Sequence, residues 1–86
     1  MVDQTLKVEV RSRQGLVFEG DLFAVTSYNT EGEFDVLPSH ANFVSMIGKR
    51  VVLRKANGQV DELAIDNGIM MVEDNKVRVF IGISKV

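Results

Sequence analysis

The sequence of 86 residues contains no cysteine and no tryptophan, and it has a single proline and a single histidine. Without cysteine the chain can form no disulfide and has no thiolate to act as a nucleophile or as a metal ligand. Its stability must therefore come from the packing of apolar side chains. These make up 45% of the residues, and a chain of this length has room for one hydrophobic core, so we expect a single domain over residues 1–86.

Positive charge is also scarce, because 10 Lys and Arg face 12 Asp and Glu and the net charge is −2. A nucleic-acid-binding surface needs basic residues that displace counterions from phosphates, so we expect no nucleic-acid partner. The longest apolar runs, at 69–72 and 77–83, are much shorter than the roughly 20 residues of a membrane-spanning helix. Residues 1–10 have no apolar segment typical of a secretory signal. We therefore expect no membrane insertion and an intracellular location.

The apolar residues that are present follow the period of β-strands. Leu6, Val8 and Val10 alternate with charged residues, and no segment has a long helical period. Later apolar runs are short, rich in Val and Ile, and separated by Gly, Asn or Asp at spacings typical of an all-β protein. We expect an all-β fold, a flattened antiparallel β-sandwich or barrel of about ten short strands. The expected strands span residues 6–11, 16–19, 22–26, 34–37, 51–55, 60–65, 69–73 and 76–83.

Turn residues mark the ends of these strands. Asn57-Gly58 predicts a hairpin, because type I′ turns need positive φ at both central residues, and Asn67-Gly68 and Asp74-Asn75 repeat this signal. Gln14-Gly15, Gly20-Asp21 and the segment 28–32 predict further connections, and Pro38 ends a strand. Residues 39–48 fit a helical turn about as well as a strand, and we favour extended chain with a short turn.

The alternation of apolar residues also predicts the core. Phe34 and Phe80 are most simply core residues as well, and at least one of the adjacent pair Met70 and Met71 should be buried, because neighbours on a strand face opposite ways. Met46 and this pair could instead belong to an interface, since methionine adapts to irregular surfaces. The predicted core consists of Leu6, Val8, Val10, Phe18, Val25, Val36, Val52, Leu63, Ile65, Ile69, Met71, Val77, Val79 and Ile81.

No combination of residues predicts catalysis or a cofactor. Ser39 and His40 are adjacent, but neighbours on an extended chain point to opposite faces, so they are unsuited to act as nucleophile and base. Glu31, Glu33 and Asp35 alternate, which suits either a weak site for a hard cation or a solvated acidic rim, and we favour the rim. Gly-rich phosphate-binding loops are absent from the sequence. We expect no catalytic residue, no bound metal and no cofactor, and a function exercised through surface contacts.

Three segments resemble the epsilon subunit of F-type ATP synthases. The segment TEGEFDVLPSHANFVSMI, residues 30–47, is similar to the family pattern TEGEFGVLPGHAPLLTAL. LKVEVRSRQGLVFEG at 6–20 resembles the family's first strand and hairpin, and LAIDNGIMMVEDNKVRVFI at 63–81 resembles its closing hairpins. Essentially the whole chain is covered, in order. The departures are Asp35, Ser39, Asn42 and Asn67, where the family usually has Gly, Gly, Pro and Gly.

The resemblance implies a non-catalytic rotor subunit of a proton- or sodium-translocating ATP synthase, which couples ion flow to ATP synthesis. It implies two partners: the gamma subunit of the central stalk and the polar loops of the membrane-embedded c-ring. By position, the ring-contact residues would be Thr30, Glu31, Gly32 and Glu33, and the gamma-contact residues would be His40, Ala41, Asn42 and Phe43. The location would be peripheral, at the cytoplasmic face of the inner or plasma membrane.

Two alternatives stay open at this stage. The sequence stops at Val86, before the C-terminal helical pair of the family, so it is either a shortened form of a longer chain or a naturally short subunit. In the second case we expect a subunit that couples rotation without inhibiting ATP hydrolysis. The chain could also be a free-standing β-sandwich interaction module that derives from this family.

Overall fold

The strands account for most of the computed structural model, which describes residues 5–39 and 41–82. Within these residues there are seven strands and no helix, and so no helix that could span a membrane. The sequence allowed either a helical turn or extended chain for residues 39–48. In the described part of this segment, a strand begins at Phe43. The strands are β1 (Leu6–Ser12), β2 (Gly15–Leu22), β3 (Ala24–Asn29), β4 (Gly32–Val36), β5 (Phe43–Arg54), β6 (Val60–Glu73) and β7 (Lys76–Ile81).

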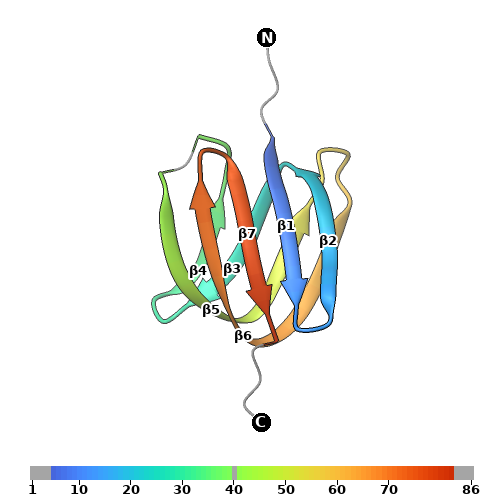
Figure 1. Ribbon diagram of the computed structural model, residues 1–86. Coiled ribbons are helices and arrows are strands. Elements are labelled where there is room, and N and C mark those ends of the chain that lie inside the picture. Colours follow the sequence, from blue (N-terminus) through green and yellow to red (C-terminus); the bar gives the residue numbers. More distant parts are fainter. Residues whose placement is uncertain (1–4, 40, 83–86) are drawn as a thin grey trace.

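The strands form one sheet that folds over on itself into two layers (Figure 1). Its order is β2-β1-β7-β6-β5-β3-β4, and every pair is antiparallel except β1 with β7. β5 and β6 are long and run through both layers. The front layer consists of β2, β1, β7, the second half of β6 and the first half of β5, and the back layer consists of the remaining halves with β3 and β4.

This architecture confirms the predicted all-β sandwich, with fewer and longer strands than the expected ten or so. One reason is that the chain runs without interruption through positions where the sequence predicted breaks. β2 continues through Gly20 and Asp21 to Leu22, and β6 continues through Asn67 and Gly68. The predicted turn at Asn67-Gly68 is therefore wrong.

A β-bulge in β6 explains why Asn67 and Gly68 lie inside a strand. Gly48 pairs with Asn67 and Lys49 pairs with Ile65, which leaves Asp66 without a partner on β5. An unpaired extra residue bends a strand and increases its twist, which is what β6 needs to pass from one layer to the other. At Gly68, an added Cβ would overlap the backbone carbonyl of Phe80, so only glycine allows β7 to pair this closely.

The core between the layers contains most of the predicted residues. Phe18, Leu63, Ile65 and Ile81 from that prediction are half-buried against it, and Phe34 packs there as well. The sequence-based list omitted Leu22, Ile47, Val51, Leu53, Met70 and Val72. The buried cluster consists of Leu6, Val8, Val10, Leu22, Val25, Val36, Ile47, Val51, Leu53, Met70, Val72, Val77 and Val79.

Three core predictions fail because of side-chain alternation around the bulge and along β7. The extra residue Asp66 reverses the alternation in β6, so Met70 and Val72 face the core while Ile69 and Met71 face outward. Phe80 follows the buried Val79 and is 38% exposed. Val52 is buried as predicted, at 8% exposure, although it is not part of the cluster that contains its neighbours Val51 and Leu53.

The other two hairpins predicted from Asn-Gly and Asp-Asn dipeptides are present, and their turns differ. β6 and β7 are joined by Asp74 and Asn75, whose φ values of 52° and 65° are those a type I′ turn requires. β5 and β6 are joined by the longer loop 55–59, in which Gly58 has φ of 93° and donates its N–H to the carbonyl of Lys55 at 3.0 Å. Asn57 has no positive φ, so this turn is not of type I′.

Candidate docking surfaces

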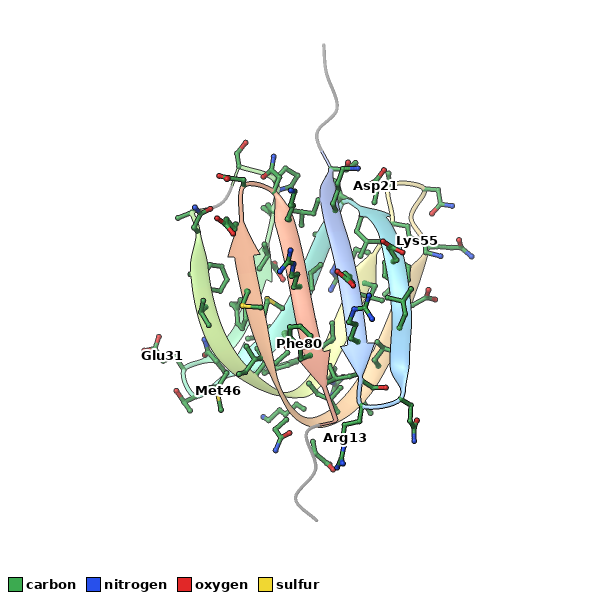
Figure 2. All side chains as sticks on the ribbon, in the orientation of Figure 1. Arg13, Asp21, Glu31, Met46, Lys55 and Phe80 are labelled. Atoms are coloured by element: carbon green, nitrogen blue, oxygen red, sulfur yellow. The ribbon has the colours of Figure 1, made fainter. Side chains whose placement is uncertain are left out.

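The outer face of the front layer carries a group of apolar side chains that the core does not use. Val44 is 69% exposed, Met46 68% and Phe80 38%, and Ile69 and Met71 are half-buried. In register, Val44 faces Met71, and Ile69 lies between Met46 on one side and Phe80 on the other. These five residues, on three neighbouring strands, are called the apolar face below. Figure 2 labels Met46 on β5 and Phe80 on β7.

Charged residues border the apolar face on the side of β1. Phe80 pairs with Arg11, and Arg78 lies between Met71 and Glu9. Arg11 forms an ion pair with Glu9. An apolar centre next to a charged border is the arrangement found in protein–protein interfaces, where the centre loses its water and the rim stays hydrated.

The outer face of the back layer is polar by comparison. Asp35 accepts a hydrogen bond from the Thr26 hydroxyl at 2.6 Å, and Arg54 Nε donates to the same hydroxyl at 3.1 Å. Thr26 is fully buried beneath these two side chains. Arg50 forms an ion pair with Glu62 at 2.7 Å on the same face.

The predicted ring-contact residues form one protruding turn between β3 and β4. Thr30 and Glu31 are its tip, and all four residues, Thr30, Glu31, Gly32 and Glu33, are exposed. Asn29 Oδ1 accepts the N–H of Glu31 at 2.8 Å, and Gly32 has φ of 119°, so the shape of the turn is set locally. Figure 1 shows this turn at the lower end of the sandwich, and Figure 2 shows the Glu31 side chain pointing away from the sandwich.

The carboxylates of this region do not form a metal site. Within residues 5–39 and 41–82, no three His, Cys, Asp or Glu side chains come close enough together to hold a metal ion. Asp35 lies on β4 and is engaged by Thr26 instead. The Ser39–His40 pair cannot be described, because His40 lies outside the described residues.

The predicted gamma-contact residues lie at the opposite end, in the connection from β4 to β5. Ala41 and Asn42 are exposed, Phe43 is half-buried at the start of β5, and His40 lies outside the described residues. The rings of Phe43 and Phe34 meet edge to face, with centroids 6.0 Å apart, and help to close this side of the sandwich. Along β5, Phe43 leads directly to Val44 and the apolar face.

Two asparagines attach this connection to the turn between β6 and β7. Asn75 Oδ1 accepts the N–H of Ser39 at 2.7 Å, and Asn42 Oδ1 accepts the N–H of Asp74 at 3.0 Å. Ser39 has φ of 69°, a conformation that glycine adopts more easily, and glycine is the residue expected there from the resemblance. The connection that leads into β5 is therefore held against the turn between β6 and β7.

The resemblance named the two loops, and the sequence left Met46 and Met71 open to an interface role, but it did not predict the apolar face as a whole. A usable signal was present, since residues 69–72 are apolar without alternation and must face both ways along a strand. Every second residue of this run therefore had to lie outside the core. The strand register was needed to show that Val44, Met46 and Phe80 join this outward set.

Comparison with known proteins gives the family. The chain matches the family profile described as "ATP synthase, Delta/Epsilon chain, beta-sandwich domain" over residues 5–82. It is 38% identical to the ATP synthase epsilon chain of Campylobacter fetus over 78 residues, 90% of this chain and 60% of that protein. It is also 38% identical to the epsilon chain of a Sulfurovum species over 74 residues, 85% of this chain and 58% of that protein. The chain thus spans about three fifths of the length of these relatives.

Solved structures share the fold. A chain of the Euglena gracilis mitochondrial ATP synthase superposes with a TM-score of 0.85 at 19% identity, over 94% of this chain and 52% of that chain. A chain from the central stalk and c-ring of the Tetrahymena thermophila enzyme superposes with a TM-score of 0.76 at 15% identity, over 94% and 66%. With the profile match over nearly the whole sequence, this chain belongs to the β-sandwich domain family of ATP synthase delta and epsilon chains.

Proposed function

We propose that this chain is a non-catalytic subunit of the central stalk of a rotary F-type ATP synthase, where it couples ion flow through the membrane ring to ATP synthesis. Family membership and the epsilon-chain relatives support this role. The observation that carries it is the apolar face, whose most exposed members, Val44 and Met46, leave large apolar surfaces in water unless a partner covers them.

The partner proposed for the apolar face is the gamma subunit. The gamma-contact residues suggested by the family, His40, Ala41, Asn42 and Phe43, lead along β5 into Val44 and Met46, so one continuous surface could serve both groups. A matching apolar patch on gamma would release water from both surfaces, and this release would supply most of the binding free energy. The charged border formed by Arg11 and Arg78 would then set the orientation of the two proteins.

The partner proposed for the Thr30–Glu33 turn is the set of polar loops of the c-ring. This turn lies at the end of the sandwich opposite the β4–β5 connection and carries two exposed carboxylates, Glu31 and Glu33. Basic or amide side chains on the ring loops would complement it, mainly by steering the encounter and fixing the register. These contacts would place the chain at the cytoplasmic face of the inner or plasma membrane, attached through proteins and not inserted in lipid.

Titration calorimetry with the gamma subunit of the same organism tests this function. We expect saturable one-to-one binding with a negative heat-capacity change, because apolar surface is buried, and little weakening at high salt. Absence of binding, with both proteins shown to be folded by circular dichroism, would contradict the proposal and would favour a free-standing interaction module.

A further inference from the structure

Two methionines of the front layer belong to the apolar face, while a third, next to one of them in sequence, belongs to the core. Met46 is 68% exposed, Met71 is half-buried, and Met70 has no exposed surface. The register places Met46 opposite Ile69 and Met71 opposite Val44, so the two outward methionines lie diagonally across neighbouring strands. Solvent therefore reaches the Met46 side chain freely and the Met71 side chain partly, and it does not reach Met70.

We propose that Met46 is a peroxide-sensitive site at which oxidation to the sulfoxide weakens docking of a partner on the apolar face. This inference rests on the proposed function, since it takes the gamma subunit as that partner. In the reaction, the thioether sulfur attacks one oxygen of hydrogen peroxide and forms the S–O bond while the O–O bond breaks. The sulfur is oxidised, the peroxide is reduced, and one water is released for each sulfoxide formed.

The effect on docking follows from the position of Met46. The sulfoxide adds a strong hydrogen-bond acceptor to an apolar, flexible side chain, in the part of the surface that should lose its water on docking. Burial of a polar group without a partner costs roughly 1–3 kcal/mol in proteins, which corresponds to a weakening of binding by about 5- to 150-fold. Docking would also cover the sulfur, so the free subunit is the form that peroxide attacks.

The fold should survive this oxidation, because the core methionine is protected. Met70 is fully buried, and it lies between Ser45 and Val79 in the sheet. Sulfoxide reductases, which return the sulfoxide to the thioether at the expense of a thiol reductant, could then restore the surface. Oxidation of the free subunit would thus be reversible and would act on assembly, not on folding.

The test combines peptide mass spectrometry with calorimetry. The full chain is treated with graded hydrogen peroxide, the sulfoxide at each methionine is quantified, and binding to gamma is measured before and after. Among the three methionines of the described residues, we expect Met46 to react first, Met71 more slowly and Met70 last, and we expect binding to weaken by about tenfold or more when Met46 is oxidised. Met46→Leu, which keeps a similar volume without the sulfur, should bind gamma like the parent chain and should keep most of this binding after peroxide.

Each outcome has a defined meaning. If the untreated chain does not bind gamma, the proposed function is wrong, and the inference is overturned with it. If the untreated chain binds and complete oxidation of Met46 leaves binding unchanged, the inference alone is overturned. The inference would also be contradicted if Met70 were oxidised as fast as Met46. It would be contradicted as well if Met46→Leu lost as much gamma binding after peroxide as the parent chain, because the damage would then lie outside Met46.

Discussion

At the scale of single residues, Gly68 controls how closely β7 approaches β6. A methyl group at this position would overlap the carbonyl of Phe80, while the backbone conformation itself needs no positive φ. The glycine is therefore required by space and not by its conformational freedom. The sequence signal was misleading here, because Asn-Gly usually indicates a turn, and only the register of β6 with β7 reveals the close approach.

Gly68→Ala should destabilise the fold by about 1–3 kcal/mol or more, because β7 would have to move away from β6. Gly48→Ala is the matched control. It lies at the same bend, and its added methyl group would meet only the carbonyl of Asp66 at an ordinary 3.5 Å. Urea unfolding followed by circular dichroism measures both variants. Equal stability of the two would show that the overlap at Gly68 is relieved without cost.

At the scale of elements, the bulge at Asp66 determines which residues of β6 enter the core. Alternation along the strand was enough to predict Leu63 and Ile65 as inward residues, and it failed beyond them because one extra residue reverses the faces. No local pattern in residues 63–72 reveals this insertion, since residues 69–72 are all apolar and fit either register. Where apolar and polar residues do alternate, as in β1, the prediction was confirmed.

Deletion of Asp66 should be far more damaging than replacing its side chain. The deletion would turn Met70 and Val72 outward or break the pairing with β7, and a slip of this kind exchanges the two faces of a strand. Asp66→Ala keeps the bulge and, at an exposed position, should change the free energy of unfolding by less than about 0.5 kcal/mol. Thermal unfolding of the two variants checks this. A deletion variant as stable as Asp66→Ala would rule out the bulge as the source of the register.

At the scale of the whole molecule, the two proposed docking surfaces differ in chemistry and in position. The turn of Thr30–Glu33 is acidic and lies at one end of the sandwich. The apolar face extends along β5 from the opposite end, at Phe43, to Met46, which Figure 2 labels near Glu31. The sequence and the resemblance predicted the all-β fold and both loops. They left Met46 and Met71 open to an interface role but could not predict the apolar face as a whole, because Val44, Met46 and Phe80 come together only through the pairing of β5, β6 and β7.

The acidic turn should make ring docking sensitive to salt. Replacement of Glu31 and Glu33 by Gln should slow association with the isolated c-ring severalfold at low ionic strength, and the difference should shrink at high ionic strength because of screening. Glu19→Gln, an exposed carboxylate on β2, is the control for net charge and should have little effect. Stopped-flow or surface-based kinetics gives the rates. An effect of Glu19→Gln equal to that of either turn carboxylate would mean that total charge matters and the turn does not.

Binding of gamma to a pair of charged variants is the most direct test of the apolar face as the docking surface. Met46→Asp places a carboxylate on that face. The control, Val60→Asp, places a carboxylate at the start of β6 in the back layer, at a residue that is 51% exposed. Burial of an unpaired charge should weaken gamma binding by about 100-fold or more in Met46→Asp and leave Val60→Asp close to the parent chain. Unchanged binding in Met46→Asp, with the variant folded, would contradict the apolar face as the gamma-docking surface.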